Sequence, residues 1–306
     1  MKAKTLLTAC MFMLGVGTNA ANDGKAILHH DKKPAAIYDA DKLSEALIAA
    51  TAGDTIYLSA GMYPTFTLDK AITIKGAGTN TKISNGVTID IPGNPTLTSS
   101  LLEAVEVNGA ITVKSDMTNF LIKMVKTTDL RFANELNTPN ALVDRCYLDK
   151  FTITSAMTDF YVRNTYIGNL TSTSLKFNKC NFINCRIQGD WNKAAGRFIN
   201  CELRSTGDNT SIKSSILSYS LVYSYYNSVH PSSYQEKVYF DDTRDWLSVD
   251  DRLTKGYICK DGTVVGVEGG KTPYSLTPSG PKETSSTVKV SDSEKKLNVS
   301  ITVSPK

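Results

Sequence analysis

Two tyrosines that recur 19 residues apart, Tyr147 and Tyr166, are the side chains of this sequence best suited to hold a ligand. They occupy the same place in two similar segments, VDRCYL and VRNTYI, and Asn181 takes that place in a third segment, FNKCNF. A sugar ring packs on the face of an aromatic ring while its hydroxyls bond to amides. The spacing therefore predicts a sugar-binding platform, with ordinary stacking of neighbouring tyrosines in a sheet as the alternative.

The middle of the chain is locally basic, which bears on the charge of such a ligand. Residues 114 to 213 contain 14 Lys or Arg against nine Asp or Glu. A basic surface attracts an anionic polymer, so an acidic glycan suits this region. The overall net charge of +4 is too mild to indicate a nucleic acid as partner. The basic residues expected to point outward are Lys123, Arg145, Arg163 and Lys179, with ordinary solvated surface charge as the alternative for each of them.

Tyrosines crowd a later segment, SYSLVYSYYNSVHPSSYQEKVYF, which holds six of the 14 tyrosines of the chain. Aromatic density of this kind is typical of a recognition surface. Some of these rings must instead fill core. Tyr225 and Tyr226 are the two that we assign to the ligand-binding surface.

Catalysis finds little support in the residue pattern. Of the three histidines, His29 and His30 lie near the start and His230 precedes a proline. The motifs GxSxG, HExxH and the Walker loop are absent from the sequence. The richest acidic run, FDDTRDWLSVDD, is interpreted as structural or solvated. We therefore leave the catalytic residues unassigned and expect no metal site.

The elements that position these residues follow from a six-residue unit seen five times. The units are Val143–Leu148, Val162–Ile167, Phe177–Phe182, Phe198–Leu203 and Ile212–Leu217. Their first and last positions are apolar, which with starts 14 to 21 residues apart predicts a solenoid of parallel strands. Asn164 and Asn200 stand at the third position, where a left-handed corner favours Asn.

The fourth position of the unit is always small, and we expect it to face the interior. Its residues, expected to stack in one column, are Cys146, Thr165, Cys180, Cys201 and Ser215. Cys180 and Cys201 would then lie on adjacent coils about 4.8 Å apart at Cα, so either stacked thiols or a disulfide is open to them. The cysteine spacing matches no zinc-binding pattern.

The two ends of the chain carry different signals. Residues 1–20 have Lys2 and Lys4 before an apolar stretch, which predicts a secretory signal peptide cleaved near Ala20. No later stretch reaches the roughly 18 apolar residues of a membrane helix. Residues 41–50 predict a short amphipathic helix, with Asp41 as N-cap, covering the open end of the solenoid.

Two segments resemble a known superfamily. KLSEALIAATAGDTIYLSAGMY with AITIKGAG resembles the entry of right-handed parallel β-helix proteins of the pectin-lyase-like superfamily, and VYFDDTRDWLSVDDRLTKGYICKDGTVVGVEGG is similar to their closing segment. The resemblance implies an all-β, single-stranded right-handed parallel β-helix. It admits a polysaccharide lyase, in which Ca²⁺ or a basic side chain neutralises a uronate; Ca²⁺ is expected only in that case.

The expected organisation is a signal peptide at 1–20, an N-terminal segment with the capping helix at 21–54, the β-helix at 55–270, and a linker with a C-terminal β-hairpin at 271–306. A lone hairpin is marginally stable, so it needs the coil or a surface partner to pack on. The leading hypothesis is a secreted, periplasmic or cell-surface protein that binds a polysaccharide without turning it over. The alternatives are a polysaccharide lyase acting on a uronate-containing glycan and a structural surface module.

Overall fold

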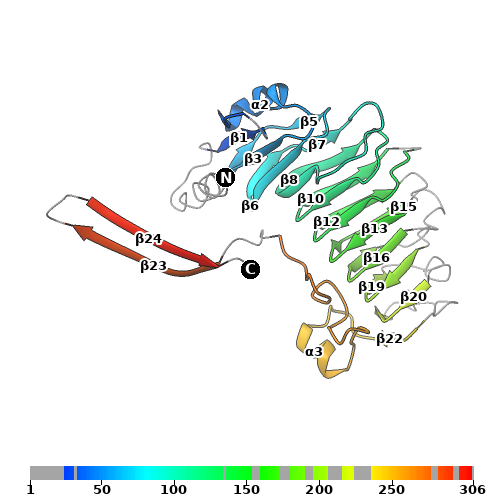
Figure 1. Ribbon diagram of the computed structural model, residues 1–306. Coiled ribbons are helices and arrows are strands. Elements are labelled where there is room, and N and C mark those ends of the chain that lie inside the picture. Colours follow the sequence, from blue (N-terminus) through cyan, green and yellow to red (C-terminus); the bar gives the residue numbers. More distant parts are fainter. Residues whose placement is uncertain are drawn as a thin grey trace.

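The computed structural model describes residues 24–30, 33–133, 136–153, 159–172, 180–189, 196–205, 216–223, 236–276, 282–291 and 296–304. The expected signal peptide lies outside these ranges. Almost every element is a strand, and parallel pairing between successive coils builds a β-solenoid of about seven turns. Figure 1 shows the coils stacked from helix α2 at one end to strand β22 and helix α3 at the other.

The strands of the solenoid form three faces that run along its axis. The first face holds β3 (Thr55–Leu58), the start of β6 (Thr73–Ser84) and of β8 (Leu102–Val113), then β9 (Leu121–Lys123), β11 (Leu142–Asp144), β13 (Phe160–Arg163), β16 (Cys180–Ile183), β18 (Arg197–Ile199) and β20 (Ile216–Ser218). The second face holds β4 (Gly61–Tyr63), the middle of β6 and β8, the starts of β10 (Lys126–Phe132) and β12 (Tyr147–Ile153), then β14 (Tyr166–Ile167), β17 (Arg186–Gly189), β19 (Glu202–Ser205), β21 (Ser220–Tyr223) and β22 (Val238–Asp241). The third face holds β5 (Phe66–Leu68), β7 (Val87–Ile89), the ends of β8, β10 and β12, and β15 (Leu170–Ser172).

The N-terminal end of the solenoid is covered by a small cap. Strand β1 (Lys25–His29) pairs antiparallel with both β2 (Ala36–Asp39) and β3, so the first coil has no open edge on this side. The predicted helix is present as α2 (Leu43–Ala49), after a 3₁₀ turn η1 (Ala40–Lys42). The N-cap is Lys42 and not Asp41, because the 3₁₀ turn takes up the first residues of the predicted range. Lys70 Nζ binds three carbonyls at the C-terminal end of α2.

The strand register confirms the repeat but corrects two of its five units. Val143 pairs with Val162, Val162 with Phe182, and Phe182 with Phe198, so the third unit is Phe182–Ile187 and not Phe177–Phe182. Phe198 pairs with Leu217, so the fifth unit is Leu217–Val222 and not Ile212–Leu217. In the structure, both units begin five residues later than the sequence predicts. Two further units precede the five, Leu102–Val107 and Ile122–Thr127.

This shift also corrects the predicted interior column. Cys180 pairs with Phe160 and lies two residues before the start of the unit at Phe182, so Cys185 takes the place beside Cys201. The stack predicted for Cys180 over Cys201 is therefore wrong, and the five described cysteines are free thiols in the interior. Ser215 lies outside the described residues, and Ser220 occupies its expected place. The column that the structure forms is Val105, Val125, Cys146, Thr165, Cys185, Cys201 and Ser220, all of them buried.

Each unit turns a corner at its third position, and the fourth position holds that corner in place. All seven third-position residues have positive φ, including Asn164 at 46° and Asn200 at 58°, as the sequence predicts. Thr165 Oγ1 donates to the Arg163 carbonyl at 2.7 Å and accepts from the Cys146 amide at 3.2 Å. The Ser220 hydroxyl and the cysteine thiols make the corresponding contacts. In these five units the small polar side chain therefore satisfies backbone groups that the corner leaves buried, whereas the two preceding units have Val105 and Val125 at the same position.

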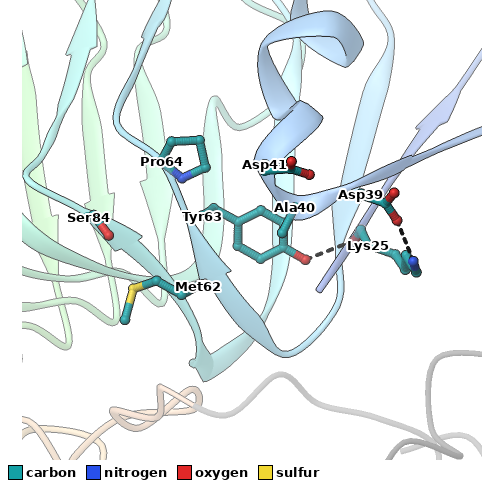
Figure 2. Close-up of a pocket in the computed structure, with 8 residues that line it drawn as sticks. All are labelled: Lys25, Asp39, Ala40, Asp41, Met62, Tyr63, Pro64 and Ser84. Carbon is teal, nitrogen blue, oxygen red and sulfur yellow. Dashed lines mark hydrogen bonds and ion pairs between the residues drawn. The ribbon is translucent and has the colours of Figure 1, made fainter. Parts of the chain in front are cut away.

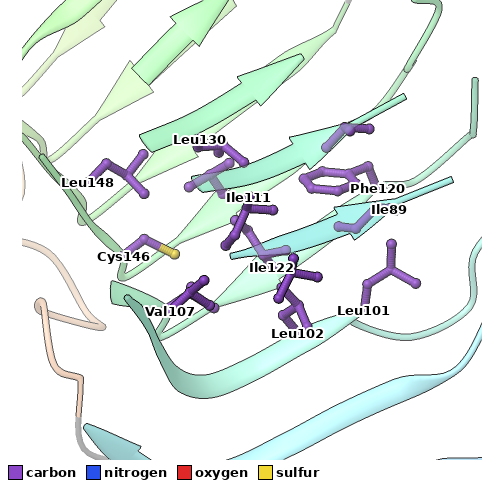
Figure 3. Packing of buried hydrophobic residues seen from close by; sticks show 14 of the residues in the cluster. Ile89, Leu101, Leu102, Val107, Ile111, Phe120, Ile122, Leu130, Cys146 and Leu148 are labelled. Carbon is purple, nitrogen blue, oxygen red and sulfur yellow. The ribbon is translucent and has the colours of Figure 1, made fainter. Parts of the chain in front are cut away.

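Apolar side chains from all three faces fill the tube, as Figure 3 shows for Ile111, Ile122, Phe120, Cys146 and Leu148. The phenylalanines meet edge to face in the middle coils, with Phe120 and Phe132 centroids 5.3 Å apart. Lower in the coil, Phe182 and Phe198 stack at 4.9 Å. Such ring pairs stabilise the core beyond the burial of their area.

The chain does not stop at the last coil. After β22 and α3 (Val249–Thr254), residues 257–276, which we name the strap, run back along the solenoid, as the orange segment of Figure 1 shows. Strands β23 (Lys282–Ser291) and β24 (Lys296–Ser304) then pair antiparallel in a separate two-stranded sheet, with Val288 opposite Val299. These are the two strands expected from the sequence; the residues that join them, 292–295, lie outside the described residues.

Candidate functional site

The two tyrosines of the predicted platform stack on each other, and Tyr274 from a later part of the chain lies close to them. Tyr147 and Tyr166 are register partners on β12 and β14, with ring centroids 4.6 Å apart and planes 12° apart. Both rings are half-buried. Burial raises the pKa of Tyr147, and Tyr274 of the strap, whose pKa is also raised by burial, lies close to it. The ordinary stacking of a sheet therefore describes this pair better than an open platform.

The next members of the same row are held under the strap. Arg186 pairs with Tyr166 in the register, so it takes the place that the repeat predicts for Asn181. Asn181 lies instead on β16 of the first face, between Tyr161 and Arg197. The misplacement has the same cause as the misaligned third unit.

A charged cluster fastens α3 and the strap to this row. Glu202 and Arg252 are both fully buried, and Arg252 Nη1 lies 2.8 Å from Glu202 Oε2. Arg186 contacts the same carboxylate at 2.8 Å, and Tyr223 donates to its other oxygen at 2.9 Å. Burial raises the pKa of Glu202, and the two guanidiniums oppose that change. We name Arg186, Glu202, Tyr223 and Arg252 the clasp. It lies at the end of the row that is nearer to the last coil.

Gly266 of the strap shows how closely the clasp is packed. Its φ is +110°, and a Cβ at this position would collide with the Glu202 carboxylate and the Arg252 guanidinium. Only glycine fits there without strain. The amide of Gly266 also donates to the Asn200 carbonyl, and Asn164 donates its side-chain amide to Gly269 at 3.0 Å.

The remaining described site residues gather on the first face, which no described segment covers at β11 and β13. Lys123, Asp144 and Arg163 are successive register partners on β9, β11 and β13. Arg145 stands at the corner beside them, with its Nε 3.1 Å from Asp144 Oδ2. Arg163 Nε lies 3.4 Å from Asp144 Oδ1, and that oxygen has no hydrogen bond within the described part of the chain. Arg163 is thus held loosely and keeps donors free for a ligand.

Tyr161 is the residue of this face that the sequence reasoning missed. It is 40% exposed, two residues before Arg163 on β13, so both side chains point outward from the same strand. Together with Asn140, Leu142 and Ile183 they line a shallow pocket of about 380 Å³. Tyr161 directly precedes the unit Val162–Ile167, and the alternation of the strand was the signal that could have found it.

The charges of the row that crosses the first face, together with Arg145, do not cancel. Lys75 and Lys123 contact Glu103 at 3.0 and 3.1 Å, and Arg145 and Arg163 share Asp144. These six residues comprise four cations and two carboxylates, which leaves a net charge of +2. Burial by itself would raise the pKa of Glu103, but the two lysines hold it below its ordinary value, so the carboxylate is ionised at neutral pH. The face therefore favours a negatively charged ligand.

A second depression, of about 630 Å³, lies at the N-terminal cap (Figure 2). Figure 2 shows the Tyr63 hydroxyl bonded to the Lys25 carbonyl, and the Lys25 ammonium paired with Asp39. Tyr63 is fully buried, so it closes the floor and offers no free group. The polar atoms of this depression serve the cap itself.

The structure also locates several of the residues considered for metal binding and catalysis. No three His, Cys, Asp or Glu side chains lie together as a metal site in the ranges that the structure describes. His30 pairs with the Asp54 carboxylate at 2.7 Å beside the cap. Asp241 of the acidic run is buried and bound to Lys255 at 2.6 Å, which gives it a structural role. Lys179, Tyr225, Tyr226 and His230 lie outside the described residues.

The fold and this face define a parallel β-solenoid with a basic, aromatic surface on one side. Comparison with models of known families finds no match for the chain, and comparisons with curated proteins and with solved structures find none either. No helix of the described residues is long and apolar enough to cross a membrane.

Proposed function

We propose that this protein binds an acidic polysaccharide on the first face of its solenoid, around Tyr161 and Arg163. The observation that carries the proposal is the exposed ring of Tyr161 beside a loosely held guanidinium, over a pocket with a net positive surround. A sugar ring stacks on the tyrosine, and its carboxylate pairs with Arg163. Binding does not require turnover.

The setting that we propose for this activity comes from the sequence. The leader-like residues 1–20 and the segments that resemble the pectin-lyase-like superfamily support a secreted, periplasmic or cell-surface location. Such a location brings the protein into contact with extracellular glycans. The thiols of Cys146, Cys180, Cys185 and Cys201 are compatible with it because they lie inside the tube, away from oxidants.

The proposal is tested by binding of the purified protein to polygalacturonate, alginate and hyaluronan, with neutral dextran as the uncharged comparison. Tyr161→Ala should weaken binding about 2- to 12-fold, the range of an aromatic stacking contact. Arg163→Gln should weaken it about 1.5- to 5-fold, and added salt should weaken it in the unmodified protein.

Arg131→Gln is the matched control, because Arg131 is also an exposed arginine paired with an aspartate but lies on the third face. It should leave binding unchanged. The proposal fails if none of the acidic polymers binds, or if Arg131→Gln and Arg163→Gln reduce affinity equally.

A further inference from the structure

The outward charges of the first face alternate in sign from one coil to the next. Lys75 pairs with Glu103 in the strand register, and Glu103 pairs with Lys123. Asp144 then lies between Lys123 and Arg163. One row of side chains therefore crosses five coils with the charges plus, minus, plus, minus, plus.

Burial separates the two signs. The side chains of Lys75, Lys123 and Arg163 are 39%, 30% and 44% exposed, whereas those of Glu103 and Asp144 are 11% and 8% exposed. Each carboxylate is more deeply buried than the cations on either side of it; Glu103 pairs with both Lys75 and Lys123, and Asp144 pairs with Arg163. A ligand that approaches this row therefore meets positive charge on every second coil.

The spacing of these cations is set by the backbone. Adjacent strands lie about 4.8 Å apart, so cations on every second strand recur at about 9.6 Å, and Lys75 and Arg163 are about 19 Å apart. An extended chain of sugar rings advances by about one strand spacing per ring. A glycan that lies along the solenoid axis therefore places every second ring beside a cation.

We infer that the ligand is a linear glycan whose negative charge recurs at every second sugar, such as an alternating uronate and N-acetylhexosamine polymer. It lies parallel to the solenoid axis, with successive carboxylates against Lys75, Lys123 and Arg163. Uncharged rings between them lie over Glu103 and Asp144, where a carboxylate would be repelled. This inference rests on the proposed function and specifies its ligand.

The test measures binding of uronate-terminated hyaluronan fragments of three and five sugars. Five rings reach all three cations and three rings reach two, so the longer fragment should bind more tightly by about 1.5- to 5-fold for the added ion pair. Lys75→Gln should remove that gain while it changes the three-sugar affinity by less than about 2-fold. Oligogalacturonate of five sugars, charged on every ring, should bind more weakly than the alternating fragment.

Lys114→Gln is the control, because Lys114 is exposed at the end of β8 on the third face. It should leave all affinities unchanged, and thermal unfolding of each variant should match that of the unmodified protein. Tighter binding of oligogalacturonate, or a Lys75→Gln variant that keeps the full gain with length, overturns the inference while the proposed function stands. Absence of binding to every acidic glycan overturns both.

Discussion

Replacing Arg252 by Met should destabilise the C-terminal end of the solenoid by about 3 kcal/mol. Removal of one partner from a buried ion pair costs about 3–5 kcal/mol, because the other charge stays buried. The lower value applies here because Arg186 still contacts Glu202 at 2.8 Å and Tyr223 still donates to it. The methionine keeps most of the packing volume, so the loss reports the missing charge and its hydrogen bonds.

The assay is denaturant unfolding followed by the fluorescence of Trp246 in a Trp191→Phe background. Trp246 lies 4.3 Å from the Arg204 guanidinium and packs edge-on against Tyr223, so its emission reports on the clasp. Far-UV circular dichroism of the same samples reports on all coils. Because each coil of a solenoid contacts only its neighbours, the tryptophan transition should move to lower denaturant further than the circular dichroism transition does.

Arg244→Met is the matched control, since Arg244 lies eight residues before Arg252 and is exposed. It should cost less than about 0.5 kcal/mol, as surface substitutions usually do. A loss below about 1 kcal/mol for Arg252→Met, or an equal loss for the control, would refute the argument that the clasp depends on this charge.

Three further predictions concern single residues. Thr165→Val should lower the free energy of unfolding, measured with denaturant, by about 1–3 kcal/mol, because the Arg163 carbonyl and the Cys146 amide lose their buried partner. Thr165→Ser keeps the hydroxyl and should be nearly neutral. Equal losses for the two variants would contradict the hydrogen-bonding role. Burial alone would raise the pKa of Asp241, but the ion pair with Lys255 and hydrogen bonds from neighbouring groups lower it to about 2. A carboxyl group with a lowered pKa stabilises the fold at pH values above its ordinary pKa of 3.8, and this contribution is lost as the pH falls toward about 2. Asp241→Asn should therefore be less stable than the unmodified protein at pH 7, and the difference in stability should vanish near pH 2. A stability difference that does not depend on pH would rule this out. The interior thiols should react slowly with a disulfide reagent at pH 8 until denaturant is added, because burial raises the pKa of Cys146 to about 12. Fast reaction of Cys146 in the native protein would show that solvent reaches the interior column.

The sequence predicts the solenoid well because its unit carries signals with local physical causes. Asn164 and Asn200 mark left-handed corners, and apolar residues two positions before and three positions after them mark strands that face inward. The error at the third unit arose because FNKCNF and FINCRI overlap at Phe182, and both satisfy the pattern. Only the pairing of Val162 with Phe182 distinguishes them.

The site was harder to predict than the fold because exposure depends on contacts between distant residues. Tyr147 and Tyr166 point outward as expected, yet the strap lies close to them, and its docking depends on Arg252 meeting Glu202, 50 positions earlier in the chain. No local sequence pattern predicts a contact between residues so far apart in the chain. Lys123 and Arg163 were predicted as outward cations, and the structure adds the buried acids that set their spacing.

The clasp also has a consequence for the order in which the protein can assemble. A chain that emerges from its N-terminal end can close each coil on the one before it, since every strand of the first face pairs with its predecessor. Glu202 is different, because Arg252 arrives only after 50 more residues have been made. Until then Glu202 has Arg186 as an ion-pair partner but lacks Arg252, so the last turns reach their final compactness only when the far end of the chain has returned.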